Sequence, residues 1–286
     1  MRLIIVPVAN RPECQVALDV AFGLAAELGA DVAGYHIRPV HREQSLALGP
    51  LLPDDDVHAS FAVADSKAGS GLKAARRIHE RVAAKHGFAL AERPARGRRM
   101  RAFWHEVAGT PARVFAVVGP VADLTVVSRP RAEGASRARA FLLGALLHSA
   151  KPVLVMPQAA HAATVGKRIV IAWNQSADAA AAVTAALPLL TRAERVVVVS
   201  AGRENRLGPS STQLARYLAH WDVSVERVRT KGQHVERELE RACRDLDADL
   251  IVMGAYSRSR FRQLVFGGVT EHMLFKTNLP VLMLHR

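Results

Sequence analysis

Two short motifs occur in both halves of the chain, in the same order. Residues 122–128 read ADLTVVS and residues 248–254 read ADLIVMG. Further on, residues 149–156 read SAKPVLVM and residues 277–284 read TNLPVLML. Because both motifs recur at a spacing of about half the chain, they predict two tandem copies of one structural unit.

Each copy has a pattern of alternating strands and helices. Both open on a basic residue and an apolar run, RLIIVPV at 2–8 and RIVIAWN at 168–174. Short β-branched runs then alternate with helix-length segments, which indicates βαβ units and a parallel sheet. In the second half we expect strands at 168–173, 195–201, 223–229, 249–254 and 281–285, with helices near 177–191, 210–221, 232–246 and 268–277. In the first half we expect strands near 2–8, 31–38, 88–93, 122–128 and 153–157, with a long helix at 67–86.

The repeat divides the chain into two α/β domains, each expected to hold a five-stranded parallel sheet with helices on both faces. A length of 286 residues suits two domains of ordinary size. We place the N-terminal domain at 1–157, with an insertion at 41–66, the linker at 158–166 and the C-terminal domain at 167–286.

The composition favours a cytoplasmic protein. The two cysteines, Cys14 and Cys243, lie far apart and form no CxxC pair, which argues against a disulfide framework or a structural zinc site. No apolar run reaches the roughly 18 residues of a membrane-spanning helix. We therefore expect a cytoplasmic protein with no membrane segment.

The second ADL motif leads into a loop rich in serine, arginine and glycine, MGAYSRSRFRQLVFGGVTEHML at 253–274. In open parallel sheets, ligands collect at the carboxyl ends of the strands. Backbone N–H groups at the start of a helix attract anions there. The loop therefore predicts an anion site that includes Gly254, Gly267 and Gly268. The alternative is that Gly267 and Gly268 only cap the next helix and permit tight packing.

Residues 254–285 resemble the end of the universal stress proteins, in which a strand is followed by G-x2-G-x9-G-[ST], an apolar helix and a PVL strand. Gly254, Ser257 and Gly267 stand at the three glycine positions here. Ser257 thus replaces the second glycine, and Gly268 replaces the serine or threonine. The resemblance covers the whole chain as two such domains and is strongest over roughly the last 120 residues. It implies flavodoxin-like (adenine nucleotide alpha hydrolase-like) domains.

The resemblance also implies that the C-terminal domain binds ATP or a related adenine nucleotide, accompanied by Mg²⁺. Asn174 takes the position of the family's aspartate and can still donate and accept hydrogen bonds at the base or ribose. Trp173 has the alternative role of core packing. The implied nucleotide-binding residues are Ala172, Trp173, Asn174, Ala201, Met253, Gly254, Ser257, Gly267, Gly268, Val269 and Thr270.

The first half lacks the glycine pattern of the second half. Arg129, Arg131 and Arg137 follow its ADL motif and could attract an anion, but no glycine pattern shapes a phosphate cradle. We expect this domain to serve dimer packing or partner contact, either in a homodimer or through pairing of the two domains within one chain.

The family resemblance implies a regulatory or protective role in the stress response rather than an enzyme. No nucleophile, general base or magnesium-binding carboxylate is evident near the loop, so we assign no catalytic residue and expect slow ATP hydrolysis at most. The 12 histidines show no zinc-site spacing and no HExxH, so we assign no metal site either. Asp54, Asp55 and Asp56 fit a solvated turn.

A second hypothesis is a basic interaction module that binds nucleic acid or a protein partner without nucleotide. It rests on the net charge of +13 and on RPARGRRMRAFWHE at 93–106, where arginines alternate with Phe103 and Trp104. No nucleic-acid-binding motif accompanies this stretch, so we do not expect nucleic acid as the partner. We expect the stretch to run from a strand end into a helix, with Trp104 packed beneath that helix.

Overall fold

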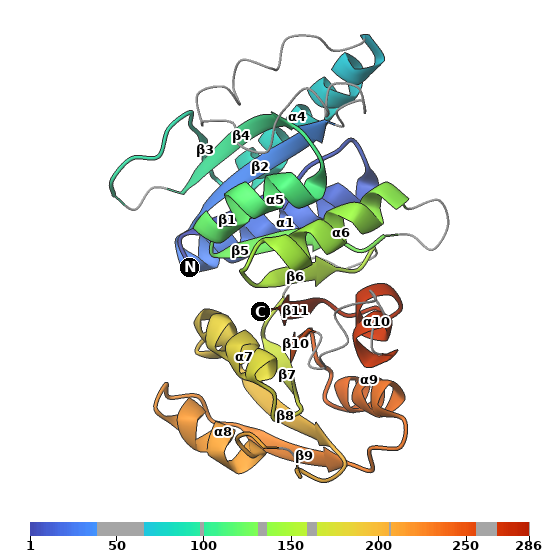
Figure 1. Ribbon diagram of the computed structural model, residues 1–286. Helices are drawn as coiled ribbons and strands as arrows, with labels where there is room; N and C mark the ends of the chain where they lie inside the picture. Colours follow the sequence, from blue (N-terminus) through green and yellow to red (C-terminus); the bar gives the residue numbers. More distant parts are fainter. Residues whose placement is uncertain are drawn as a thin grey trace.

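The computed structural model describes residues 1–38, 66–97, 100–130, 136–158, 165–205, 207–255 and 268–285 (Figure 1). For residues 66–69 and 136–137 it describes the backbone alone. In the first half the elements are β1 (Leu3–Pro7), α1 (Pro12–Leu28), β2 (Asp31–Arg38), α4 (Ser66–Lys85), β3 (Ala89–Leu90), β4 (Arg101–Ala108), α5 (Pro111–Val118), η1 (Gly119–Val121), β5 (Leu124–Ser128), α6 (Ser136–His148) and β6 (Val153–Met156). In the second half they are β7 (Arg168–Trp173), α7 (Ala177–Leu190), β8 (Arg195–Ala201), α8 (Ser211–Ala219), β9 (Glu226–Thr230), α9 (Val235–Asp245), β10 (Leu250–Gly254), α10 (Gly268–Phe275) and β11 (Val281–Leu284).

Within these described residues the strands join into one sheet, in the order β3-β4-β2-β1-β5-β6-β11-β10-β7-β8-β9. Neighbouring strands are parallel except at the junction, where β6 and β11 pair antiparallel with Leu282 opposite Leu154. The two halves therefore meet edge to edge, as Figure 1 shows, and their strands run in opposite directions.

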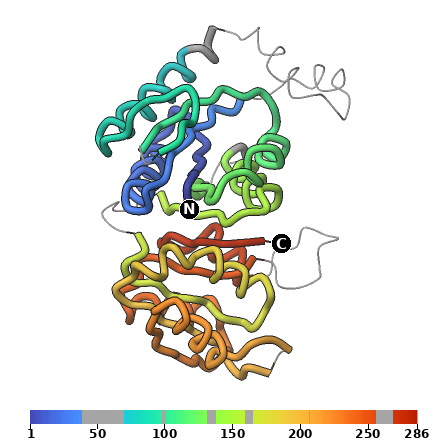
Figure 2. The backbone as a smooth tube through the Cα atoms, turned by 90° about the vertical axis from the view of Figure 1, so that its left-hand side faces the viewer, coloured from blue at the N-terminus to red at the C-terminus, as the bar shows by residue number. Residues whose placement is uncertain are grey.

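Helices cover both faces of the sheet, and one apolar cluster lies on each face. The first cluster packs under α1, α4, α7 and α8, and the second under α5, α6, α9 and α10. Alternate residues of β6 and β11 enter opposite clusters, so that Leu154 and Leu282 join the first while Val155 and Val281 join the second. Both cores therefore continue across the junction, and Figure 2 shows the two halves against one another from the side.

The predicted α/β fold with a mostly parallel sheet and helices on both faces is confirmed. The strand order adds a correction to the flavodoxin-like assignment. In the second half the order is third, second, first, fourth, fifth, as in the first five strands of a Rossmann sheet, whereas flavodoxin has 2-1-3-4-5. The point where the connections diverge therefore lies between β7 and β10.

The helix expected after the basic stretch is wrong, because residues 101–108 form strand β4. This strand pairs with β2 along its whole length, from Ala102 opposite Val32 to Ala108 opposite Arg38. The strand expected at 88–93 is reduced to the two residues of β3. The Phe, Trp and Val residues of β4 suit a pleated, half-buried strand. The described part of the first half consequently has six strands, where five were expected.

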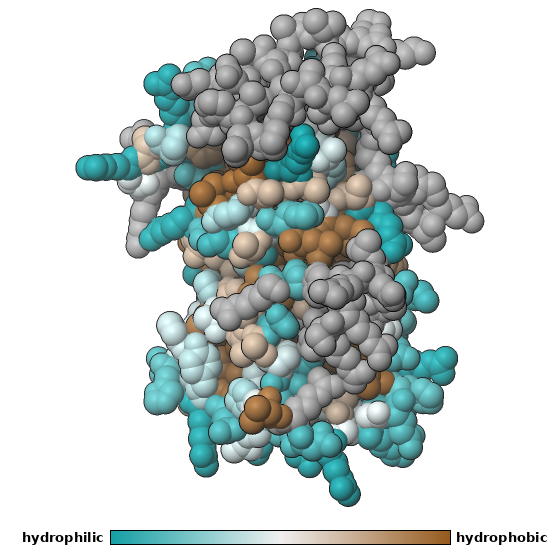
Figure 3. Space-filling model, in the orientation of Figure 1, coloured by the Kyte–Doolittle hydropathy of each residue, from teal (hydrophilic) through white to brown (hydrophobic). Residues whose placement is uncertain are grey.

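Among the described residues, the large apolar side chains exposed at the surface are Leu90, Val117, Val121, Leu207, Tyr217 and Trp221. On the face drawn in Figure 3, hydrophobic surface accordingly occupies separate small areas. None of the described helices combines the length and apolar character that crossing a membrane requires.

Candidate functional site

The carboxyl ends of β7 and β10 lie side by side at the point where the chain leaves the sheet in two directions. β7 leads to α7 on one face, and β10 leads towards α10 on the other. Met253 is directly opposite Ala172 in this pair, and Trp173 lies opposite Ser200 of β8. The structure therefore brings together the predicted residues of three strand ends at one edge of the sheet.

Trp173 ends β7 as a core residue. Its side chain is buried, and its indole Nε1 donates to the carbonyl oxygen of Pro209 at 2.9 Å. Two residues on, the side-chain nitrogen Nε2 of Gln175 donates to the carbonyl oxygen of Gly208 at 3.1 Å. Gln175 itself is buried and has a φ of 62°, which is uncommon for a residue with a side chain. These two bonds hold the segment before α8 against the end of β7.

Asn174 is oriented by the turn that starts α7. Its side-chain oxygen Oδ1 accepts from the backbone N–H of Ser176 at 3.1 Å and from the Ser176 hydroxyl at 2.7 Å. The Ser176 hydroxyl oxygen in turn accepts from the N–H of Ala179 at 3.1 Å and caps the helix. The half-buried Asn174 side chain is therefore held in one orientation at the strand end.

The end of β8 borders the same region. Ala201 is half-buried, and its neighbour Ser200 donates through its hydroxyl to Glu204 at 2.8 Å. Glu204 also accepts from the N–H of Ser211 at the start of α8, at 3.1 Å and 3.2 Å. Burial acts to raise the pKa of Glu204, but the hydrogen bonds from Ser211 and Ser200 outweigh it and lower that pKa from its ordinary value. Glu204 thus acts as a hydrogen-bond acceptor for the N-terminus of α8.

Gly254 ends β10 in contact with the first turn of α7. A Cβ atom built on Gly254 would lie 2.5 Å from the nitrogen of Ala179 and 2.7 Å from the carbonyl carbon of Asp178. Both are backbone atoms that cannot rotate away, so a side chain at this position has no room. Close packing against α7 therefore accounts for glycine at 254.

Gly268 differs from Gly254 in this respect. It is exposed at the start of α10, and a Cβ built there would meet no described atom within 4 Å. The next two residues of α10 point inward, with Val269 packed on the second cluster and Thr270 buried. Ser257 and Gly267, the other two members of the predicted phosphate loop, lie outside the described residues.

Asp178 is a carboxylate beside this site that the sequence reasoning missed. It stands in the first turn of α7, and its Cβ would lie 2.9 Å from a Cβ built on Gly254. We expected no magnesium-binding carboxylate near the glycine loop. That expectation is corrected at Gly254, where the loop begins, because Asp178 lies beside it. The N-x-S-x-D order at 174–178 was the available signal, but only the packing of α7 on β10 brings Asp178 to the site.

In the first half, side chains fill the corresponding place. The repeat aligns Val8 with Asn174 and Ser128 with Gly254. The ring nitrogen Nδ1 of His36 lies 2.9 Å from the carbonyl oxygen of Val8, and the Ser128 hydroxyl donates to the carbonyl oxygen of Glu13 at 2.8 Å. In the first half, the positions that match Asn174 and Gly254 thus contact other parts of the same half through Val8 and Ser128.

Of the arginines that follow the first ADL motif, the structure describes the side chain of Arg129, and it does not face an anion site. Arg129 is buried and donates to backbone carbonyl groups at the end of α10, so its guanidinium is already engaged. Arg131 and the side chain of Arg137 lie outside the described residues.

The basic stretch at 93–106 also departs from expectation. Arg101 is buried and donates to the carbonyl oxygen of Ala95 at 2.7 Å. Phe103 is buried, and the Trp104 ring packs on the ring of His79 from α4, with centroids 5.4 Å apart. The Phe103 ring is therefore not presented to solvent for stacking on bases, and the half-buried Trp104 ring packs on α4. Arg98 and Arg99 lie outside the described residues.

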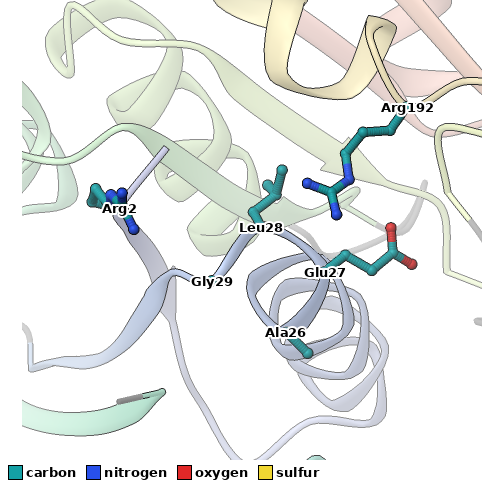
Figure 4. Close-up of a pocket in the computed structure, with 6 residues that line it drawn as sticks. All are labelled: Arg2, Ala26, Glu27, Leu28, Gly29 and Arg192. Atoms are coloured by element: carbon teal, nitrogen blue, oxygen red, sulfur yellow. The ribbon is translucent and has the colours of Figure 1, made fainter. Parts of the chain in front are cut away.

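A cavity of about 350 Å³ lies elsewhere, at the C-terminal end of α1. It is lined by Arg2, Ala26, Glu27, Leu28, Gly29 and Arg192. Arg192 and Glu27 lie on one side of it and Arg2 on the other (Figure 4). Arg192 follows the far end of α7, and a helix of 14 residues is about 20 Å long, so this cavity is remote from the strand ends described above. Its mixed charges and its place at a helix C-terminus do not suit an anion.

No group of three or more histidine, cysteine, aspartate or glutamate side chains that could hold a metal ion occurs within the described part of the chain.

Comparison with known proteins finds a family that the second half resembles. Residues 166–285 match the model of the universal stress protein family. A universal stress protein of Synechocystis sp. is 45% identical over 49 residues, a match that covers 17% of this chain and 17% of that protein. Among solved structures, a universal stress protein from Archaeoglobus fulgidus is similar with a TM-score of 0.66 and 13% identity, over 99% of this chain and 96% of that one.

A putative universal stress protein from Pseudomonas aeruginosa is similar with a TM-score of 0.55 and 16% identity, over 100% of this chain and 93% of that one. At such identities the two structures establish the fold, which they share over nearly the whole length of the chain. The family match itself lies on the half that carries the candidate site. Residues 166–285 are therefore similar to the universal stress protein family in sequence, and the whole chain is similar to proteins of that family in fold.

Proposed function

We propose that the C-terminal half binds ATP or a related adenine nucleotide, and that the protein acts in the stress response as a nucleotide-dependent regulatory or protective factor. The observation that carries this proposal is that the ends of β7 and β10 lie side by side. From there the chain leads to α7 on one face of the sheet and towards α10 on the other. In open α/β sheets, ligands bind at such a divergence of connections.

The base and ribose would lie at the ends of β7 and β8. Asn174 is held by Ser176, so its amide presents a fixed hydrogen-bonding edge without loss of side-chain entropy on binding. Ala172, Met253 and Ala201 would supply apolar contacts around the base, since all three belong to adjacent strand ends.

The phosphates would lie at the start of α10. Its first N–H groups have no partner within the helix, and the helix dipole adds positive potential there. Gly268 is exposed with open space beside it among the described residues, so a phosphate could approach the backbone closely. The net charge of +13 would further attract a polyanion.

Mg²⁺ would enter with the nucleotide, because this ion usually keeps several waters and binds through phosphates and one or two carboxylates. Asp178 is the described carboxylate that fits this role, from its place beside Gly254. We assign no nucleophile or general base, and we propose a binding protein in which any hydrolysis is slow.

The test is isothermal titration of the whole chain with MgATP, together with acid extraction of the freshly purified protein to detect bound nucleotide. Asn174→Ala should weaken binding. Asn10→Ala is the matched control, because Asn10 is exposed in the loop after β1 of the first half. Absence of MgATP binding by the native protein would refute the proposal. A steeply salt-dependent complex with DNA or RNA in its place would favour the basic interaction module.

A further inference from the structure

We infer that Arg129, a residue of the first half, positions the phosphate-binding helix of the second half by holding its C-terminal end. This inference rests on the proposed nucleotide site, because α10 begins where the phosphates would lie. The first half would then be a required part of the site in the second half, although it contributes no residue that touches the nucleotide.

The contacts are made by the whole guanidinium group. Nε of Arg129 donates to the carbonyl oxygen of Leu274 at 2.8 Å, and Nη2 donates to those of Met273 and Leu279, both at 3.1 Å. Nη1 donates to the carbonyl oxygen of Thr277. Three nitrogens of one side chain thus bind four carbonyl groups in the last turn of α10 and the segment that follows it.

These carbonyl groups lie where a helix needs partners. The last C=O groups of a helix have no intrahelical donor, and the helix dipole makes that end negative. Arg129 satisfies both requirements from a position that is 4% exposed. Burial lowers its pKa to about 10, so the guanidinium remains charged at neutral pH. Within the described part of the chain, the partners of this charge are backbone carbonyl groups.

α10 depends on such external support because it has eight residues, too few for a stable isolated helix. The second half holds it through His272, whose ring nitrogen Nε2 lies 2.9 Å from Glu240 of α9. The first half holds it through Arg129 and through Arg139, whose guanidinium carbon lies 4.5 Å from the centre of the Phe275 ring. An eight-residue helix is about 12 Å long, so a shift at its C-terminal end displaces the N–H groups at Gly268.

The position of Arg129 in the repeat supports the role of the first half in holding α10. It follows β5 directly, where the second half has Ala255 at the start of its phosphate loop. The first half thus places an arginine at the start of the segment that matches the phosphate loop and directs it into the other half. The segment of the first half that matches the phosphate loop would thus be coupled to the nucleotide site proposed in the second half.

The experiment compares the full-length protein with Arg129→Met and Arg129→Lys. Arg77→Met is the matched control, since Arg77 is an exposed arginine on α4 of the first half. The first readout is hydrogen exchange of the α10 amides without nucleotide, with the α7 amides as an internal reference in the same half. The second is the Kd for MgATP from isothermal titration.

We expect faster exchange in α10 but not in α7 for Arg129→Met, and about a tenfold rise in the Kd, a typical size for coupling between sites. Arg129→Lys should lie between Arg129→Met and the native protein, because one ammonium keeps the charge but not the fork of donors. This variant also keeps the test open if Arg129→Met does not fold. Arg77→Met should match the native protein in both readouts.

The inference is overturned if α10 exchanges at the native rate in both Arg129 variants, or if α10 loosens while the Kd stays the same. Failure of the proposed function gives a different result. In that case the native protein itself shows no MgATP binding, whatever the exchange of α10.

Discussion

Gly34 on β2 lies directly against the imidazole of His79 on α4. A Cβ atom built on Gly34 would fall 2.6 Å from Cδ2 of that ring and 3.0 Å from its Nε2. The ring is enclosed by Phe22 and Trp104, at centroid distances of 5.5 Å and 5.4 Å, and is fully buried. Glycine at 34 is therefore what allows α4 to pack this histidine onto the sheet.

Gly34→Ala should destabilise the protein, because the added methyl group overlaps a ring that is packed on all sides. Overpacking of a core usually costs about 1–3 kcal/mol. Urea unfolding measures the loss. The same substitution should cost less when it is made in His79→Ala than in the native protein, since the overlapping atoms are then gone. Gly71→Ala on α4 is the control. No described atom lies within 4 Å of a Cβ there, and alanine should stabilise the helix by up to about 1 kcal/mol.

The same histidine should make folding stability depend on pH. Both ring nitrogens of His79 are buried and have no hydrogen-bond partner among the described residues, and burial lowers the pKa of the ring from 6.5 to about 4. Above pH 6.5 the ring is neutral in the folded and the unfolded chain and contributes no pH dependence. As the pH falls from 6.5 towards 4 the unfolded chain binds the proton first, so stability decreases.

The expected loss from this group between pH 7 and pH 5 is about 2 kcal/mol. Urea unfolding at the two pH values, for the native chain and for His79→Leu, isolates it, because carboxylates such as Asp19 titrate in both proteins. An equal change in stability for both proteins would mean that His79 is protonated in the fold or is not the group responsible.

The repeat predicted two α/β units and a mostly parallel sheet because strand alternation and the ADL and PVL motifs are local features. How the units join is not local. All four residues of β6 and all four of β11 are buried, so each strand needs cover on both faces and a neighbour on its open edge. That neighbour could be the other half of the chain or another copy. The β6–β11 pair shows the first arrangement.

Strand β4 was missed because it begins at Arg101, at the end of a basic stretch, and because its aromatic pair also fits a helix start. The segment forms a strand because it pairs in register with β2. That pairing depends on how the whole chain folds rather than on the sequence of the segment itself. At the site, the resemblance to the universal stress proteins indicated the strand ends, and the structure places Ala172 and Met253 together there. The sequence alone could not indicate the roles of Asp178 and Arg129, because both residues act on segments far away in the sequence.

Asp178→Asn should weaken MgATP binding more than binding of ATP without the ion, because a carboxylate beside the phosphates acts mainly through Mg²⁺. We expect the Mg²⁺-dependent gain in affinity to fall by several-fold, measured by titration with ATP in the presence and absence of Mg²⁺. Thermal unfolding should change little, since asparagine is also accepted in the first turn of a helix. Asp245→Asn is the control, as Asp245 is exposed at the end of α9. The same Mg²⁺ dependence in Asp178→Asn and the native protein would exclude this ligand.

Gly254 and Gly268 should respond oppositely to substitution, because one glycine serves packing and the other is proposed to serve the ligand. Gly254→Ala places a methyl group 2.5 Å from the Ala179 nitrogen, so the protein should unfold at lower urea concentration, by about 1–3 kcal/mol, whether or not nucleotide is present. At Gly268 a side chain meets no described atom, so Gly268→Val should unfold almost as the native protein does.

The valine should instead block the approach of phosphate to the N–H groups of α10 and reduce the ATP-induced rise in Tm. Gly268→Ser, which restores the hydroxyl of the family pattern, should be tolerated and could strengthen binding up to about tenfold, the value of one added hydrogen bond. Thermal melts with and without MgATP measure all three variants. If Gly268→Val keeps both the native Tm and the native ATP-induced shift, the start of α10 is not where the phosphates bind.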